Sequence, residues 1–150
     1  MIKVKPSIIK GVKSASGTPT KVELLQATFQ HIADVQCAIA WICGKLIEAG
    51  AAHDHTKISG IDDFHETYAQ SLTKDAFYSS EWYKAHLQER HHLSARCPDD
   101  VTLIDVLERI ADIVTAGISR NGTVYEDNLD PEILIKAYKN TVDLLIRQIE

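Results

Sequence analysis

Apolar residues recur at helical spacing along residues 21–49, and this pattern constrains the fold more than any other feature of the chain. Leu25, Phe29, Ile32, Ile39 and Leu46 are three, four or seven residues apart. That spacing places them on one face of an α-helix, as is typical of a helix that packs against a core. The sequence therefore predicts a long helix over residues 21–49 that ends near Gly50.

Further helices are predicted from the same periodicity and from capping residues. They are expected over residues 51–57, from Asp62 or Asp63 to about Leu72, from Ser79 or Ser80 to the histidine pair 91–92, over 101–118, and from Asp130-Pro131 onward. Residues 1–20 contain Pro6, Gly11, Gly17 and Pro19 and are expected to form an extended N-terminal arm. The rest, 21–150, has no alternating strand pattern and has the length of one domain. We therefore expect an all-α bundle of five to six helices.

Composition narrows the set of partners. The net charge of −5 argues against an extended nucleic-acid surface, because such a surface needs concentrated basic residues. The apolar stretches are interrupted and the N-terminus does not resemble a signal peptide, so we expect a cytoplasmic protein without a membrane partner. The N-terminal arm and the apolar last helix are candidates for contacts in a homo-oligomer.

Histidine is the unusual residue of this chain. All seven histidines fall between residues 31 and 92: His31, His53, His55, His65, His86, His91 and His92. Because histidine is the commonest metal ligand and the usual acid or base near neutral pH, this density calls for a chemical explanation.

Three local patterns suggest metal ligands. The adjacent His53 and Asp54 can both reach one ion if the backbone turns at a helix end, although such a pair alone is more often a capped helix end. His31 lies beside apolar positions and is expected to face inward, where it would bind a metal or a backbone carbonyl. Asp112 lies in a largely apolar segment, so it either faces solvent or is held by a cation.

The order of these residues resembles the H…HD…D signature of the HD superfamily of metal-dependent phosphohydrolases. The His-Asp-x-x-Lys form, which ends at Lys57, and the double histidine 91–92 are similar to the HD-GYP phosphodiesterase branch, but the Gly-Tyr-Pro motif is absent. From about Phe29 onward the chain also resembles small tailed-bacteriophage proteins of unknown activity, in which Trp-x-x-x-His and His-His precede an Ile-Asp-x-Leu-Glu helix. The resemblance implies an HD-like helical fold for residues 21–150.

The resemblance also implies a ligand set. The first metal would be held by His31, His53, Asp54 and Asp112, and Asp54 would bridge to a second metal held by His86 and by His91 or His92. The expected cofactor is one or two divalent transition-metal ions, of manganese, iron, cobalt, nickel or zinc. Asp54 and Lys57 would act in catalysis, and Lys57, Arg90 and Arg96 would contact substrate phosphates. Apart from the resemblance, Asp105 lies two turns before Asp112 on nearly the same helix face and would orient a metal ligand, whereas His55 and His65 are left out.

The implied activity is hydrolysis of a phosphoester or phosphoanhydride in a nucleotide or cyclic nucleotide. If the chain is encoded by a phage, its substrates would include host nucleotide pools or defence signals in the host cytoplasm. Three alternatives remain open: a non-hydrolytic protein that binds a nucleotide or a host protein, a di-iron oxygenase of the HD type, and a helical structural protein whose histidines bind no metal.

Overall fold

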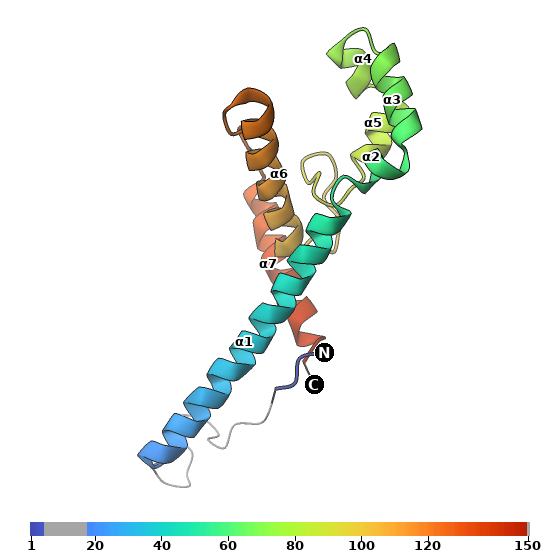
Figure 1. The fold of residues 1–150 in the computed structure, drawn as a ribbon. Helices are drawn as coiled ribbons and strands as arrows, with labels where there is room; N and C mark the ends of the chain where they lie inside the picture. The colour runs from blue at the N-terminus through green and yellow to red at the C-terminus, as the bar shows by residue number, and fades with distance from the viewer. Residues whose placement is uncertain (5–17, 150) are drawn as a thin grey trace. The chain divides into compact units, whose positions relative to one another are not determined.

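The computed structural model describes residues 1–4 and 18–149, and Figure 1 shows that the described chain is helical. The helices are α1 (Lys21–Ala52), α2 (His55–Ser59), α3 (Ile61–Gln70), α4 (Lys74–Tyr78), α5 (Glu81–His86), α6 (Leu103–Asn121) and α7 (Pro131–Ile146). Within the described ranges the only β-type pairing is an isolated bridge between Ile2 and Ile149. The predicted all-α fold is confirmed. Most of the predicted N-terminal arm, residues 5–17, lies outside the described residues.

Two helix starts follow the predicted capping residues. The Ser80 hydroxyl accepts a hydrogen bond from the Tyr83 backbone N–H at the start of α5. Asp130 accepts one from the Glu132 N–H just before Pro131, at the start of α7. These caps satisfy amide groups that have no partner inside the helix, which explains why local sequence predicts these two starts correctly.

Three predicted boundaries are wrong. The long helix continues to Ala52, so the next helix begins at His55 rather than at residue 51. Gly60 occupies the cap position of α3, which leaves Asp62 and Asp63 inside its first turn. Helix α5 ends at His86, before the histidine pair, and the short α4 between Lys74 and Tyr78 was not predicted.

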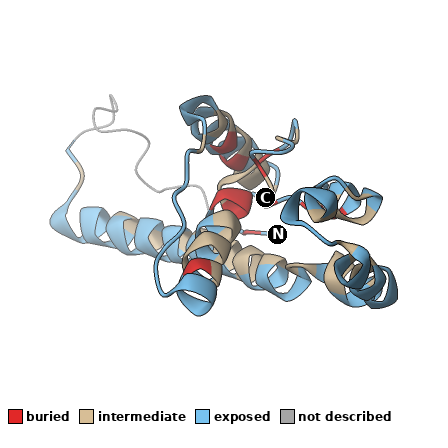
Figure 2. Ribbon diagram, turned by 90° about the horizontal axis from the view of Figure 1, so that it is seen from above, coloured by how far each residue is buried: buried red, intermediate tan, exposed pale blue. Residues whose placement is uncertain are grey.

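The chain divides into two compact units, one made of residues 1–45 and 142–150 and the other of residues 46–141. In the first unit the two ends of the chain pair, because the Ile2 N–H donates to the Gln148 carbonyl at 2.6 Å. No residue of α1 is buried, and Phe29, Ile32 and Ile39 are exposed. Figure 2 shows this helix in the exposed and intermediate colours.

One long apolar segment bears on the expected location. By length and composition, residues 21–59 could cross a membrane, although we expected the interrupted apolar stretches of this chain to be unsuited to one. Core helices of soluble proteins and signal sequences satisfy the same criteria. The cytoplasmic location therefore stays a prediction.

A small core holds the second unit together. Leu93 and Val101, from the segment before α6, pack with Val106 of α6 and Ala137 of α7. The Thr141 hydroxyl accepts a hydrogen bond from the Leu103 N–H at 2.8 Å, which joins the start of α6 to α7. Burying an aliphatic side chain contributes about 1.5–3 kcal/mol. This core therefore fixes the segment that carries His91 and His92 against the first turns of α6.

An aromatic cluster organises the short helices of the same unit. Phe64 of α3 stacks on Trp82 of α5 with ring centroids 4.3 Å apart, and Phe77 of α4 packs 6.0 Å from Trp82. The His86 ring also stacks on Trp82: the two ring centroids are 5.3 Å apart and the rings are nearly parallel. The aromatic packing thus positions His86 at the end of α5.

Candidate metal centre

The turn between α1 and α2 presents the His53-Asp54 pair. Asp54 has φ 55° and ψ 25°, and it is the one non-glycine residue with positive φ among the described residues. Aspartate tolerates this left-handed conformation better than most residues. The chain therefore turns at the pair, as the metal interpretation requires, and His53 Nε2 lies 3.7 Å from Asp54 Oδ2.

The loop after α5 presents the double histidine, and two arginines fasten this loop to α6. Arg90 donates to both carboxylate oxygens of Asp105, at 2.6 and 2.9 Å. Arg109 of α6 donates to the His91 carbonyl and to the Ser94 hydroxyl. Charge-assisted hydrogen bonds of this kind are stronger than neutral ones, so the loop is held firmly on α6.

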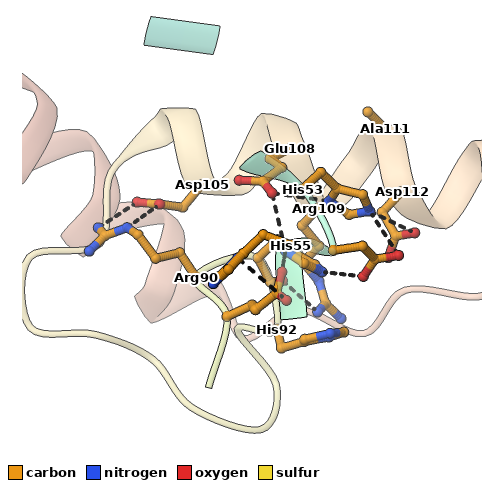
Figure 3. A network of polar contacts seen from close by, with 12 residues as sticks. His53, His55, Arg90, His92, Asp105, Glu108, Arg109, Ala111 and Asp112 are labelled. Carbon is orange, nitrogen blue, oxygen red and sulfur yellow. Dashed lines mark hydrogen bonds and ion pairs between the residues drawn. The ribbon is translucent and has the colours of Figure 1, made fainter. Parts of the chain in front are cut away.

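Glu108 of α6 joins His53 and His91. Its Oε1 lies 3.0 Å from His53 Nδ1 and 3.1 Å from His91 Nδ1. The two imidazole rings lie 4.2 Å apart. Figure 3 shows Glu108 and Asp112 on α6, with His53 beside them. One carboxylate oxygen thus meets a histidine from each of two segments that are distant in sequence.

His91 provides the test of whether a cation fits here. Its side chain is 2% exposed, and its Nε2 is buried without a hydrogen-bond partner among the described residues. That nitrogen lies 3.9 Å from Asp54 Oδ1. A buried polar atom without a partner is costly, and a metal ion is a natural partner for an imidazole nitrogen that faces carboxylates. The donor set therefore fits a divalent cation.

Three overlapping groups of side chains can each hold a metal ion. They are His53, His91 and Asp112; Asp54, His91 and His92; and Asp54, His86 and Glu89. Within each group the potential ligand atoms all lie within 4.8 Å of one another. Imidazole nitrogen with carboxylate oxygen suits zinc, iron, nickel and related transition metals. Because Asp54 and His91 each belong to two groups, the groups form one continuous cluster.

The Asp54 end of the cluster brings two further imidazoles together. His86 Nε2 lies 3.0 Å from His92 Nε2 and 3.5 Å from Asp54 Oδ1. Two ring nitrogens at this separation can share a proton or turn their lone pairs toward one cation. His86 and His92 therefore meet at Asp54, as the resemblance implies for a second metal.

Burial and neighbouring charges shift the pKa values of this cluster. Burial, together with the nearby His91 and His86, lowers the pKa of His92 to about 4. Burial and the Lys57 ammonium lower the pKa of His86. Burial opposes ionisation of Asp54, but the hydrogen bond and charge of Lys57 outweigh it and lower the pKa of this carboxyl group. His86 and His92 are thus neutral and Asp54 is ionised at neutral pH, which are the forms that bind metals.

His91 differs from the other two histidines. Burial acts to lower its pKa, but the hydrogen bond and the negative charge of Glu108 outweigh burial and raise it. The pKa of Glu108 is lowered, because hydrogen bonds from His91 and His53 outweigh its own burial. Glu108 is therefore an ionised acceptor for both imidazoles.

Most of the predicted ligands meet in the second unit. His53, Asp54, His86, His91, His92 and Asp112 all belong to the groups described above. His31 is exposed on α1, in the other unit, and belongs to none of the three groups. Within its own unit His31 is exposed, in contrast to the expectation that it faces inward. Its role as a ligand stays a prediction.

The side chains predicted to contact substrate phosphates differ in whether they lie beside the metal ligands. The Lys57 ammonium is hydrogen-bonded to Asp54 Oδ2, so it lies beside the cluster. The Arg90 guanidinium is occupied by Asp105 and Asp100, and it anchors the loop instead of facing the metal ligands. Arg96 is exposed and donates to Gln88. Asp105 pairs with Arg90 and Thr102, so it does not hold a metal ligand directly, as we had expected it to do.

Three participants were not predicted from the sequence: Thr56, Glu89 and Glu108. Glu89 is buried and accepts hydrogen bonds from both the backbone N–H and the hydroxyl of Thr56. The usable signal for Glu108 was its position four residues before Asp112, since residues so spaced share a helix face. The corresponding signal for Glu89 was its position three residues after His86.

No protein-family model, curated protein or solved structure matches this chain.

Proposed function

We propose that the second unit is a metal-dependent phosphohydrolase domain of the HD type, acting on a nucleotide or cyclic nucleotide. The observation that carries the proposal is the buried Nε2 of His91, which has no partner among the described residues and faces Asp54. The contacts of His53 with Asp54 and with Asp112 add support, because these three residues also carry the resemblance in sequence.

The chemistry requires an activated water molecule and a polarised phosphoryl group. A bound divalent metal lowers the pKa of its water to about 7 and withdraws electrons from a phosphoryl oxygen. The reaction would form a bond from phosphorus to the water oxygen and break the bond from phosphorus to the leaving oxygen, which takes up a proton. Asp54 and the histidine Nε2 atoms would hold the metal.

Lys57 has a distinct role in this proposal. Its ammonium carries a compact positive charge beside the ligands and is held there by Asp54 Oδ2. A lysine of this kind can attract and orient a phosphate. The Arg90 guanidinium is already paired with Asp105, whereas the Lys57 ammonium is hydrogen-bonded to Asp54, one of the proposed metal ligands. Lys57 is therefore the better placed of the two to contact a substrate phosphate.

The decisive variant is Asp54→Asn, because asparagine tolerates the left-handed backbone at this position better than alanine. Purified protein would be incubated with manganese and a panel of nucleotides and cyclic nucleotides, and released product would be measured over time. We expect turnover by the wild type and a loss of at least about a hundredfold in the variant, because the ligand charge is gone.

Asp62→Asn is the matched control, since Asp62 is an exposed aspartate in the first turn of α3. It should retain wild-type turnover. Metal binding without release of any product from the panel would favour the non-hydrolytic binding protein. Oxygen consumption with iron, together with indifference to the phosphate compounds, would favour the oxygenase.

A further inference from the structure

We propose that Glu108 and Glu89 are positioning residues that fix three histidines in one tautomer, with Nδ1 protonated and the Nε2 lone pair turned toward the cluster. This inference deepens the proposed function, because it concerns how the chain prepares its metal ligands before an ion arrives. The histidines are His53, His91 and His86.

Glu108 acts on two of them directly. An ionised carboxylate can only accept hydrogen bonds, and Glu108 Oε1 lies within 3.1 Å of Nδ1 in both His53 and His91. Each Nδ1 must therefore carry the proton in a neutral ring. The remaining Nε2 of His53 then faces Asp112 at 3.6 Å, and that of His91 faces Asp54 at 3.9 Å.

Glu89 acts on His86 through a hydroxyl group. The Thr56 hydroxyl donates its single proton to Glu89 Oε1, so it can only accept from His86 Nδ1, which lies 2.8 Å away. His86 therefore also carries its proton on Nδ1. Its bare Nε2 is the acceptor that faces His92 Nε2 at 3.0 Å.

This arrangement assigns Glu89 a role other than that of a ligand. Its Oε1 already accepts two hydrogen bonds from Thr56, and it lies 3.4 Å from His86 Nδ1, on the side of the ring away from Asp54. Both carboxylates thus contact the protonated nitrogens, whereas Asp54 and Asp112 face the bare ones. Carboxylates that hold the far nitrogen of a ligating histidine fix its orientation and increase its basicity.

Long-range proton–nitrogen NMR spectra of the metal-free, ¹⁵N-labelled protein read the tautomer of each histidine. The spectra would be recorded at about pH 8.5, roughly two units above the ordinary histidine pKa. We expect His53, His86 and His91 to show the Nδ1–H pattern. The exposed His65 serves as the internal reference for a ring without these carboxylates.

Two variants separate the two carboxylates. Glu108→Gln should alter the tautomer signature of His53 or His91 and leave His86 unchanged, while Glu89→Gln should alter that of His86 and leave His53 unchanged. Manganese affinity, measured by calorimetry, should fall by about tenfold to a hundredfold in Glu108→Gln. If Glu108→Gln does not fold, Glu108→Asp retains the charge on a shorter side chain and should weaken the Nδ1–H signature of at least one of the two rings.

Nε2–H tautomers at His53 and His91 in the wild type, or signatures unchanged by either glutamine variant, would overturn this inference. A merely structural role of the two glutamates would lower stability without moving the tautomers. The NMR experiment uses metal-free protein, so its failure leaves the proposed hydrolysis standing. Absence of hydrolysis, conversely, does not alter the expected tautomers.

Discussion

Arg90 and Asp105 form the ion pair that ties the histidine loop to the first turn of α6. Asp105 is buried and accepts hydrogen bonds from Arg90 and from the Thr102 backbone and hydroxyl. Burial acts to raise the pKa of Asp105, but hydrogen bonds from Arg90 and Thr102 outweigh it and lower this pKa. The pair therefore stabilises the fold most when Asp105 is ionised.

This ion pair predicts a pH-dependent effect of Asp105→Asn. Because the folded pKa lies below the unfolded value of about 3.9, the stabilisation is complete above that pH and is lost as the pH falls through the folded pKa. At neutral pH the variant should lose about 2 kcal/mol, a value below that of a fully buried pair because the Arg90 side chain is 47% exposed.

Urea unfolding of wild type and variant at several pH values measures this difference. The difference should stay nearly constant between about pH 6 and about pH 4 and should shrink as the pH falls further, to about 2. Asp100→Asn removes an exposed carboxylate from the same guanidinium and should change stability by less than about 0.5 kcal/mol. A deficit in Asp105→Asn that is the same at both ends of the pH range would contradict this account.

The sequence alone predicts only part of what the individual residues of this site do. The histidine and aspartate ligands could be proposed because residue type and order carry that information. The partners of Arg90 could not, because Asp100 and Asp105 reach its guanidinium only once the loop folds back on α6. For the same reason the contacts of Glu108 with His53 and His91 became visible only in three dimensions.

At the scale of elements, Gly117 marks a close approach between α6 and the chain that follows it. A Cβ atom at this position would lie 2.5 Å from the Thr123 carbonyl oxygen and 2.6 Å from the Tyr125 nitrogen. Both neighbours are backbone atoms that cannot move aside without shifting the returning segment. The absence of a side chain is therefore required at this position.

We predict opposite effects for two glycine-to-alanine substitutions in helices. Gly117→Ala should destabilise the protein by about 1–3 kcal/mol, because the backbone contact outweighs the better helix propensity of alanine. At Gly44 of α1 no described atom lies within 4 Å of the added Cβ, so Gly44→Ala should stabilise by up to about 1 kcal/mol. Thermal or urea unfolding checks both, and a Gly117→Ala variant at least as stable as wild type would refute the close contact.

The predicted elements show which local signals suffice. Two helix starts were predicted correctly, at Ser80 and at Asp130-Pro131, because a helix cap depends only on neighbouring residues. The start of α3 was misplaced because Asp62 and Asp63 suit both a cap and a first turn, where acidic side chains also favour the helix dipole. The apolar face of α1 predicted the helix itself correctly.

At the scale of the molecule, the second unit has a small apolar core and a polar cluster beside it. The core is formed by Leu93, Val101, Val106 and Ala137. The cluster joins the turn after α1, the end of α5 with the loop that follows it, and α6. A cation bound there would act as a cross-link between these segments, because metal binding couples to folding.

The most direct test of the central claim is the metal content of the purified protein. The chain would be produced in medium supplemented with manganese, zinc or iron, freed of loose ions by gel filtration, and analysed by mass spectrometry of its elements. The wild type should retain one or two ions per chain, and His91→Gln should retain far less because it removes the buried nitrogen shared by two ligand groups. Wild-type protein that remains free of metal after every supplementation would contradict the account.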